Sequence, residues 1–544
     1  MGFLSKQART VLKRRIKNFW IDFSHNKIGM IGLSILIVYL VVAVFSPWIA
    51  PYSEKEVRTD NPERHADTFA FPEWIGIISP SHRNLPKDTT YELRWSLANT
   101  TFPESISINQ TQENINIYYD ANKTKSDDPV TVVLETTFNY PYKGKTLNLF
   151  SIKFNWKAEP KEIVTVYKTI IVGGKVIVIP IPLGSNGSIA YMLRLQFINS
   201  EGKIFEIWDQ NWWKLKYLDP YAKPEFWSSN TTSSVNLASS QAQLSEKLGY
   251  GSANNRNMTR DMFSAPGNYT LRFIVTIKPG VVWDEETKTW VEIPIERAKG
   301  TITISHASLR IYGRIFGRLG TDGYGHDVFS QLVHGFRISL AVGLAAALLS
   351  VTLGMFVGIL AGYLGGIVDE TLMRIVDILL CLPGLPILII LISIFGYNVW
   401  WVVVLIAIFG WQGLSRVIRS QVLSLRERPF IESAVASGAS KSYIMVRHLV
   451  PNVLPVVLAS FILSVPGAVI TEAALSFLGF GDPFSPTWGK ILHTAQQTNA
   501  LSVNVIAWWV VVPPGFAITI LCLAFVFIGH AVDEIVNPRL RRRR

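Results

Sequence analysis

The sequence predicts an α-helical membrane protein with six transmembrane helices and an inserted all-β-rich, sandwich-like extracellular domain. Three observations predict this fold class: long apolar runs, a one-sided distribution of positive charge, and a polar segment with strand-like alternation. The chain has 544 residues, of which 49% are hydrophobic. A helix needs about 20 mainly apolar residues to cross the hydrocarbon core of a bilayer. Six runs have roughly this length: 28–49, 338–363, 372–395, 399–414, 453–475 and 506–529.

Glycine and proline predict the shape of two of these runs. Gly354, Gly358 and Gly362 recur at every fourth residue of the second run, and this spacing predicts close helix–helix packing. Pro383 and Pro386 interrupt the third run, where the missing N–H groups predict a kink. The first run is longer than the apolar core of a signal peptide and lacks a clear cleavage site, so we expect it to remain as a transmembrane helix.

Positive charge predicts how the chain crosses the membrane. The net charge is +12, and basic residues crowd three segments: 1–27, 416–447 and 531–544. Six crossings place these segments on one side, which the positive-inside rule identifies as the cytoplasm. We therefore expect a multi-pass protein of the plasma membrane with both termini cytoplasmic and residues 52–317 extracellular. The basic tail can contact membrane lipid, whereas the absence of interleaved aromatic residues argues against a nucleic-acid partner.

The polar segment 52–317 predicts the β-rich domain. Hydrophobic and polar residues alternate within it, and Gly173–Gly174 is typical of a hairpin turn. The Ser- and Asn-rich stretch 228–257 predicts a long loop. The predicted strands are 130–138, 147–156, 163–172, 175–181, 189–198, 269–277 and 301–304. A length of this order and many short strands fit a sandwich.

Acceptor motifs for N-glycosylation give an independent indication of the extracellular side. All seven Asn-x-Ser/Thr motifs of the chain fall in the segment 52–317. Together with the charge rule they predict a glycosylated external surface, of the kind found on archaeal cells. The candidate residues are Asn99, Asn109, Asn122, Asn186, Asn230, Asn257 and Asn268.

No residue pattern predicts catalysis or a metal site. The cysteines Cys381 and Cys522 lie within predicted spans, which argues against a disulfide framework. His306, His326 and His334 lack metal-ligand spacing, so we interpret them as surface or capping residues. The tryptophans of the external segment, such as Trp208, are interpreted as core residues of the β domain. The alternative is that these aromatic side chains stack on sugar rings or hold a partner.

Five groups of residues resemble one family of membrane proteins. They are Asn26–Leu33 with Ser46–Tyr52, Gly320–Asp327 with Gly335–Leu340, Gly362–Glu370 with Met373–Asp377, Glu432–Asn452, and Thr471–Gly481 with Pro486–Gly489. In this order they resemble the C-type permease subunits of dipeptide and oligopeptide ABC importers, which are inner-membrane components of binding-protein-dependent transport. Two residues depart from the family pattern, Ser433 for alanine and His326 for arginine. The large external insertion has no counterpart in the family.

The resemblance implies a type I ABC importer permease core at residues 318–530. It also implies two groups of functional residues. The permease motif comprises Gly320, Thr321, Asp322, Gly325, Asp327, Glu472, Gly479 and Gly481. The cytoplasmic loop 426–452 would couple the permease to an ATPase through Glu432, Ala434, Gly438, Arg447, His448, Pro451 and Asn452.

The residue chemistry of this coupling loop fits that implication. Glu432 can pair with a basic residue of a partner groove or cap its own helix, and Ala434 allows close approach. Gly438 permits a turn that a side chain would hinder. Arg447 and His448 can fix the loop to the next helix, which we expect Pro451 to open. The alternative interpretation is an amphipathic loop that lies on the membrane surface.

The resemblance implies a transport subunit rather than an enzyme. The phosphate-binding pattern Gly-x-x-x-x-Gly-Lys-Ser/Thr is absent, so no cofactor is expected on this chain, and ATP and Mg²⁺ would bind to partner subunits. The expected partners are a second homologous permease, two cytoplasmic ATPases and an extracellular substrate-binding protein. Substrates would be di- or oligopeptides, or oligosaccharides. A different hypothesis is a glycosylated receptor or adhesin with a helical anchor; a third makes the external domain the substrate receptor.

Overall fold

The computed structural model describes most of the chain in two compact units. It describes residues 17–536 apart from residue 18 and the stretches 112–113, 124–127, 144–146, 161–164, 173–174, 183–187, 211–231, 252–254, 285–288, 293–298 and 503–504. One unit, here the helical unit, consists of the residues up to Glu73 and those from Gly317 onward. The other, the β unit, is Trp74–Phe316. The predicted external segment is therefore longer than the β unit, because residues 52–73 pack in the helical unit.

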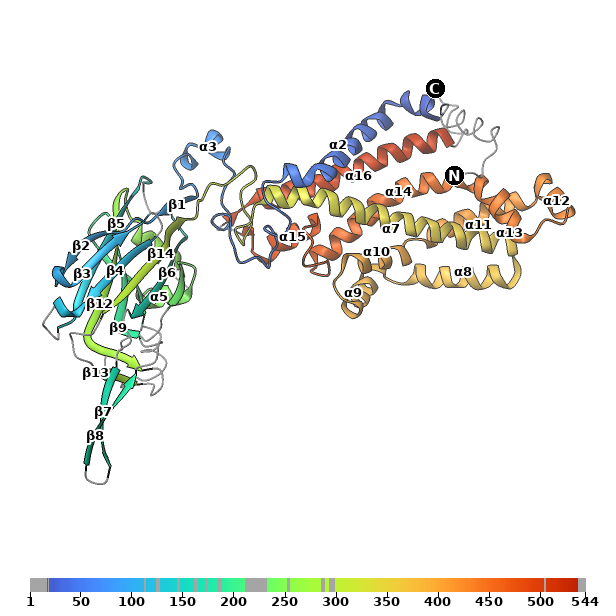
Figure 1. Ribbon diagram of the computed structural model, residues 1–544. Coiled ribbons are helices and arrows are strands. Elements are labelled where there is room, and N and C mark those ends of the chain that lie inside the picture. The colour runs from blue at the N-terminus through green and yellow to red at the C-terminus, as the bar shows by residue number, and fades with distance from the viewer. Residues whose placement is uncertain are drawn as a thin grey trace. The chain divides into compact units, whose positions relative to one another are not determined.

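Among the described residues, four helices of the helical unit are long and apolar enough to cross a membrane (Figure 1). They are α2 (Lys27–Ile49), α7 (Val328–Leu364), the continuous run Lys441–Phe477, and α16 (Trp508–Val536), whose apolar part is Trp508–Ile535. Two bent helix pairs are each long and apolar enough when taken together, so the number rises to six if each pair is one span. The pairs are α8 (Gly366–Cys381) with α9 (Gly384–Phe395), and α10 (Val399–Ile408) with α11 (Gln412–Arg426).

The predicted kink is a sharp break between α8 and α9. The two helices meet at 93°. Leu382 is extended, as expected of a residue that precedes proline, and Pro383 stands at the N-cap of α9. The third apolar run is thus divided into two helices at Pro383.

A glycine stripe on α7 lets α11 pack at very short range. A Cβ atom on Gly354 would lie 2.8 Å from the carbonyl oxygen of Trp411, and one on Gly358 would lie 2.7 Å from the Cβ of Ile418. A Cβ atom on Gly362 would lie 2.9 Å from the Cβ of Val422. Real Cβ atoms do not approach other heavy atoms this closely, so only glycine permits the contact. The close packing predicted from the four-residue spacing is present.

Two ion pairs join α8 to the same helix α11. The guanidinium of Arg419 donates to both oxygens of Asp369 at 2.5 Å, and Arg416 pairs with Asp377. A fork of two parallel hydrogen bonds fixes direction as well as distance. Helix α11 is therefore held to α7 by close backbone packing and to α8 by ion pairs.

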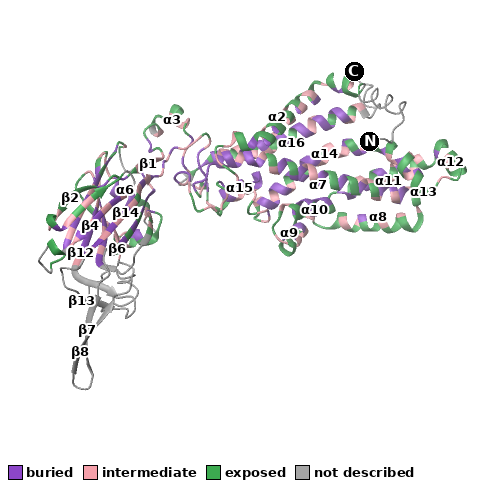
Figure 2. Cartoon of the chain, viewed as in Figure 1, coloured by how far each residue is buried: buried purple, intermediate pink, exposed green. Residues whose placement is uncertain are grey.

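Exposed residues lie along the outward faces of the helices (Figure 2), and many of these residues are large and apolar. On α2, for example, Val44 is 64% exposed and Trp48 is 76% exposed. Lipid or partner helices are the surroundings in which such surfaces are stable. Buried residues lie along the helix contacts, where Gly29 and Gly32 of α2 pack against Ala531 and Ala524 of α16.

The β unit is built from two six-stranded antiparallel sheets. Phe154 of the first sheet packs on Phe273 of the second at 5.3 Å between ring centroids, so the sheets share one core. The first sheet has the order β11 (Thr232–Ala238), β6 (Phe150–Pro160), β14 (Lys299–Ile311), β4 (Asn114–Asp120), β3 (Ile106–Gln110), with β1 (Thr89–Glu92) beside β14. The second has the order β10 (Ile204–Asp209), β9 (Ser188–Ile198), β12 (Gly267–Asp284), β5 (Val130–Tyr140), β2 (Ser96–Thr100), with β13 (Thr289–Glu292) beside β12.

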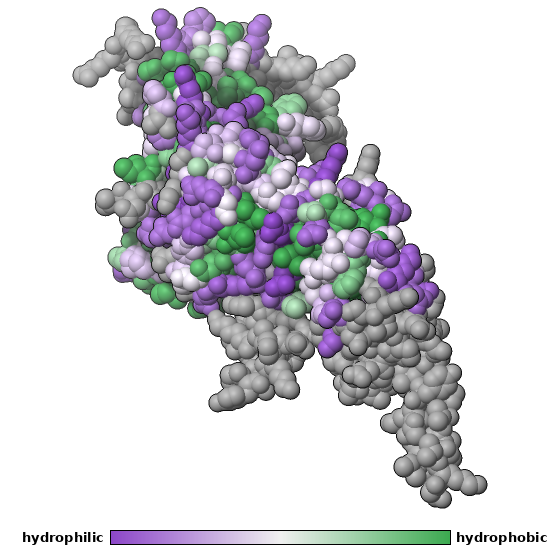
Figure 3. All heavy atoms as spheres, turned by 90° about the vertical axis from the view of Figure 1, so that its left-hand side faces the viewer, coloured by the Kyte–Doolittle hydropathy of each residue, from purple (hydrophilic) through white to green (hydrophobic). Residues whose placement is uncertain are grey.

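Alternation of side chains explains why these segments are strands. In β5 the buried residues are every second one from Val130 to Tyr140, as expected where one sheet face meets the core. The hairpin β7 (Thr165–Val172) and β8 (Lys175–Pro182) stands apart as a separate two-stranded sheet. Figure 3 shows hydrophilic residues interspersed with hydrophobic ones on the visible face of the β unit.

The prediction of a long loop at 228–257 is wrong for the described residues of that stretch. They form β11, the helix α5 (Ala242–Lys247) and the start of α6 (Asn255–Met262). The apolar side chains of this stretch are few, but Leu244 is buried in the core, as are Met258 and Met262, which follow the stretch in α6. A handful of buried anchors is enough to order a segment whose composition is otherwise typical of a loop.

Candidate functional site

The coupling loop contains a short helix, α12 (Pro429–Ala436), between α11 and the run Lys441–Phe477. Pro429 takes the first helical position, where its missing N–H costs nothing. Gly438 lies just after the end of the helix, with a φ of 79°, and Ala439 N–H donates to the Ala434 carbonyl at 3.1 Å. A Cβ on Gly438 would meet no atom within 4 Å. The need for glycine there comes from the left-handed backbone and not from crowding.

Two buried isoleucines fasten this loop to the helical core. Ile431 of α12 and Ile444 in the helix α13 (Lys441–Ile444) are each 1% exposed. They belong to a cluster that also contains Ile359 of α7 and Ile418 of α11. The loop is therefore joined to α7 and α11 by apolar contacts.

The rest of α12 is open to a partner. Glu432 and Val435 are exposed, Val435 by 55%, and Phe430 beside them by 42%. A hollow of about 470 Å³ runs along this helix; its lining residues are Tyr363, Leu364, Arg426, Ile431, Glu432, Val435, Ala436 and Lys441. A carboxylate between two basic groups and a rim of apolar side chains form a surface of mixed chemistry, as protein interfaces do.

His448 and Pro451 lie at the far end of the loop. The His448 ring lies 6.2 Å from the ring of Phe430 and 5.8 Å from that of Tyr443, so it connects α12 to the next helix. Asn452 Nδ2 donates to the His448 carbonyl at 2.7 Å, and Arg447 is exposed.

Pro451 stands in the first turn of α14, as we expected, but α14 continues an earlier helical run. The helix is continuous from Lys441 to Phe477, and a π-helical turn, Met445–Leu449, precedes α14 (Val450–Phe477). Proline cannot donate to the carbonyl four residues earlier and its ring crowds that group. A wider turn before Pro451 relieves this conflict without ending the helix.

The first part of the permease motif, Gly320–Asp327, is a buried loop that fixes the residues before the β unit. Thr321 is fully buried; its hydroxyl donates to the Asp67 carbonyl at 2.5 Å and accepts from the Ala70 N–H at 2.8 Å. The Thr321 carbonyl accepts from the indole N–H of Trp509 at 3.2 Å. One threonine thereby joins the segment 65–70 to α16.

Glycines allow this loop to approach its neighbours. Gly320 has a φ of 67° and Gly325 has a φ of 86°. A Cβ on Gly320 would collide with the Ala70 carbonyl, and one on Gly325 would lie 2.6 Å from that of Ala66. Both positions therefore require glycine for the backbone conformation and for space.

Two aspartates order the loop and the start of α7. One oxygen of Asp322 accepts from the N–H groups of Tyr324 and His326 at 2.9 Å, and the other from Gln331 at 2.8 Å. Asp327 is the N-cap of α7 and accepts from the Ser330 N–H at 2.7 Å. Burial raises the pKa of the Asp327 carboxyl, against the opposing effect of its hydrogen bonds with Ser330.

The second part of the permease motif packs α14 against α15 (Trp488–Gln497). Glu472 is 3% exposed and accepts from the Ser476 hydroxyl at 2.7 Å. A Cβ on Gly481 would collide with Ser476, while Gly479 has a φ of 91° and lies against His493. These residues close a tight joint between the helices, and none of them lies on the coupling loop.

The histidines His326 and His334 are buried, and our interpretation of them as surface or capping residues is wrong. They are 1% and 6% exposed, and their ring nitrogens lie 3.2 Å from the Asn61 carbonyl and 2.9 Å from the Tyr52 carbonyl. They hold the segment that follows α2 in place. Among the described residues no group of three or more histidine, cysteine, aspartate or glutamate side chains could hold a metal ion.

The candidate glycosylation residues that the structure describes lie on the surface. These are Asn99, Asn109, Asn122, Asn257 and Asn268, all exposed. Asn186 and Asn230 lie outside the described residues. Exposure is required for modification, and whether the residues are modified stays a prediction.

Sequence reasoning missed the basic rim of the α12 hollow. Arg426 and Lys441 are far apart in the chain and line the same hollow only because the loop folds back on itself. The sequence signal that could have indicated this rim was a basic residue before Glu432 in the chain and another after it. Ile431 and Ile444 were missed because isolated apolar residues in a polar loop show no periodicity.

Comparison with known proteins is consistent with this geometry. Residues 354–542 match the family described as binding-protein-dependent transport system inner membrane component, and residues 15–67 match the N-terminal TM domain of oligopeptide transport permease C. The oligopeptide transport system permease protein OppC of Escherichia coli K12 is 43% identical over 225 residues, which cover 41% of this chain and 72% of that protein. A putative peptide permease protein of Brucella suis biovar 1 is 38% identical over 221 residues, covering 40% and 72%.

A solved structure of the MetNI methionine ABC transporter in an inward-facing conformation also matches. It is 21% identical and covers 39% of this chain and 96% of that chain, with a TM-score of 0.31.

Proposed function

Because the chain belongs to the family of binding-protein-dependent transport inner-membrane components, in its oligopeptide permease C branch, we infer that it is the membrane-spanning permease subunit of an ATP-driven ABC importer. The observation that carries this proposal is α12. It exposes Glu432 and Val435 beside a hollow, while Ile431 anchors it in the core. An exposed helix with a rigid foundation is suited to receive force from a partner and pass it on.

We propose that the partner at α12 is a cytoplasmic ATPase. A groove on that subunit would receive Val435 and Phe430 as apolar anchors, and a basic group in it would pair with Glu432. Closure of two ATPases around ATP and Mg²⁺ would displace α12, and the buried contacts of Ile431 and Ile444 would carry the displacement to α7 and α11. A second homologous permease would form the other half of the pathway.

We propose di- or oligopeptides as the substrates, delivered by an extracellular binding protein. The names of the matching relatives support this substrate class. A hollow of about 460 Å³ in the helical unit supports it too, because Arg337, Glu54 and Asp482 bring both signs of charge to its lining beside apolar side chains of α7 and α10. Peptides carry a charged group of each sign at their ends. The match to oligopeptide permeases favours the importer over the alternative of a receptor or adhesin.

The proposed topology has six crossings, with each bent pair as one span. Both termini and α12 would face the cytoplasm, and Trp74–Phe316 would lie outside the cell. The support is the positive charge of residues 1–27, of the segment around α12 and of the tail.

Purification of the tagged chain from native membranes in a mild detergent tests the proposal. We expect a second permease and two ATPases in the eluate, identified by mass spectrometry. Val435→Arg should remove the ATPases and retain the second permease, because a charge replaces an apolar anchor. Leu97→Arg, at an exposed apolar residue of β2, is the matched control and should retain all subunits. A chain that purifies alone in every case would contradict the proposal.

A further inference from the structure

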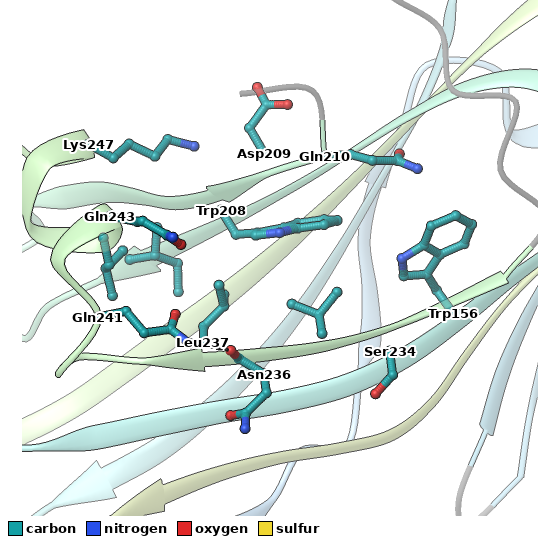
Figure 4. Close-up of a pocket in the computed structure, with 13 residues that line it drawn as sticks. Trp156, Trp208, Asp209, Gln210, Ser234, Asn236, Leu237, Gln241, Gln243 and Lys247 are labelled. Carbon is teal, nitrogen blue, oxygen red and sulfur yellow. Dashed lines mark hydrogen bonds between the residues drawn. The ribbon is translucent and has the colours of Figure 1, made fainter. Parts of the chain in front are cut away.

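A pocket of about 330 Å³ opens in the β unit beside the edge strands of both sheets (Figure 4). Strand β11 is the edge of the first sheet and β10 is the edge of the second, and the helix α5 adds a wall. The lining residues are Trp156, Ile207, Trp208, Asp209, Gln210, Ser234, Val235, Asn236, Leu237, Gln241, Gln243, Leu244 and Lys247. The pocket therefore belongs to one compact unit and shares no residue with α12.

The indole ring of Trp208 gives this pocket a rigid apolar surface, and the buried ring of Trp156 also lines it. Figure 4 shows the Trp208 ring in the middle of the pocket, between Gln243 and Lys247 on one side and Trp156 on the other. The Phe154 ring meets Trp208 edge-on, with centroids 5.3 Å apart, and Tyr191 meets Trp156 in the same way at 5.5 Å. Core aromatic residues thus hold both indoles in place.

Trp208 differs from the other core aromatic residues in its exposure. Trp156 is 2% exposed and belongs to the core cluster, whereas Trp208 is only partly buried and packs against its edge. A bulge between Glu206 and Trp208 shifts the register of β10 against β9 at this point. Bulges redirect a side chain that regular pairing would place elsewhere.

The polar side chains of the lining are mostly amides. Asn236, Gln241 and Gln243 are exposed, and Gln210 lies opposite them near Trp156. Gln210 Nε2 donates to the Tyr191 hydroxyl at 3.3 Å, which orients its side chain. An amide offers a donor and an acceptor together. The hydroxyl group of a sugar has the same dual character.

The charged side chains at the pocket have partners within the protein. The ammonium of Lys247 lies 3.6 Å from a carboxylate oxygen of Glu206, and Asp209 attracts it as well. A ligand with a net charge would have to compete with these pairs. The lining is therefore better matched to a neutral ligand than to the charged ends of a free peptide.

We propose that this pocket binds a neutral oligosaccharide, of which one or two hexose rings lie inside the pocket. The C–H face of a hexose would stack on the indole of Trp208, and the amides of Asn236, Gln241 and Gln243 would bond its hydroxyl groups. The volume is at the lower end of the range for small-molecule sites, about 300–1,000 Å³. This inference goes beyond the importer function and does not depend on it, since it concerns recognition by the β unit alone.

The test uses the full chain in phospholipid nanodiscs. Detergents with a maltoside or glucoside head group are excluded, because that head group belongs to the proposed ligand class. Maltotriose, mannotriose and galactotriose are the saccharide probes, and tri-alanine is the peptide probe. Binding is measured by saturation-transfer NMR and by titration calorimetry.

Three variants locate the binding. Trp208→Ala should weaken saccharide binding by at least about tenfold through loss of the stacking face. Gln243→Ala should weaken it by about three- to tenfold, and this exposed residue keeps the test valid if Trp208→Ala unfolds the β unit. Gln110→Ala is the matched control, because Gln110 is an exposed glutamine on β3, at the opposite edge of the first sheet from β11.

Binding of at least one trisaccharide that weakens in Gln243→Ala and remains unchanged in Gln110→Ala supports the proposal. Absence of binding for all three trisaccharides at millimolar concentration overturns it. Binding of tri-alanine that is lost in Gln243→Ala also overturns it, because the pocket would then be a peptide site.

Discussion

The backbone N–H of Glu73 donates a hydrogen bond to the carbonyl oxygen of Gly317 at 3.0 Å. These two residues border the β unit on its N-terminal and C-terminal sides. The chain therefore leaves the helical unit and returns to it at one place. Adjacent ends are the usual condition under which a domain can be inserted into another without deforming it.

Replacement of Trp74–Phe316 by a Gly-Ser linker of about four residues should leave the helical unit folded, because such a linker spans the short gap between Glu73 and Gly317. We expect a monodisperse protein on gel filtration, with a thermal unfolding midpoint within a few degrees of that of the full chain. Thr321→Val in the shortened protein is the comparison that should lower the midpoint, since it removes the hydroxyl that holds segment 65–70. The prediction would be contradicted if the shortened protein aggregated while the full chain did not.

The glycine stripe predicts an asymmetry between two helical glycines. Gly358→Ala should destabilise the helical unit by about 1–3 kcal/mol, because the new methyl group would overlap Ile418. Gly413→Ala should be neutral or slightly stabilising, because a Cβ there meets no atom within 4 Å and alanine is the better helix former. Thermal unfolding of the two variants in the same nanodiscs measures the difference. Equal effects would show that α7 and α11 are not in close contact.

Glu432→Ala should reduce substrate uptake while the chain remains folded and in the membrane. Glu432 is exposed, so its removal costs the isolated chain little, whereas the proposed ATPase contact loses a charge. Uptake and ATP hydrolysis by the reconstituted importer are measured together, and we expect more ATP hydrolysed per substrate transported. Glu427→Ala is the control, since this exposed carboxylate precedes α12 and does not line the hollow. Unchanged coupling in Glu432→Ala would remove α12 as the transmitting element.

Asp327 predicts a pH-dependent contribution to stability. Burial raises the pKa of its carboxyl, so the folded protein keeps a proton that the unfolded chain has already released. The unfolding free energy should therefore fall as the pH rises from the ordinary aspartate pKa, about 3.9, through the raised one. Asp327→Asn retains an N-cap acceptor and removes this titration. The midpoint of the variant, relative to the original protein, should rise as the pH increases from the ordinary aspartate pKa through the raised one; parallel curves would contradict the assignment.

The long helices could be predicted because hydropathy is a property of the chain itself. Their ends could not be predicted in every case. Helix α7 begins at Val328, ten residues before the apolar run, because Asp327 caps it and its first turns contain Gln331 and His334. These polar side chains are buried through tertiary contacts with Asp322 and Tyr52 that the local sequence does not encode.

The candidate site was predictable as a segment and not as a surface. Residues 426–452 were identified by their resemblance to a family, and Gly438 by the demand of a turn. The hollow beside α12 was not foreseen, because Tyr363 and Lys441 come to it from different helices. The pocket beside Trp208 in the β unit was not foreseen either. One of its walls is α5, which lies in a stretch that composition alone predicts to be a loop.

The glycine stripe has a consequence for motion. Gly354, Gly358 and Gly362 leave α11 no clearance to slide along α7, and the Arg419–Asp369 fork prevents α8 from turning away from α11. The displacement that we propose for α12 would therefore move these three helices together as one rigid body. Around this body the helix ladder is interrupted at Pro383 between α8 and α9 and at the 42° bend between α10 and α11, and these are the places where bending would be easiest.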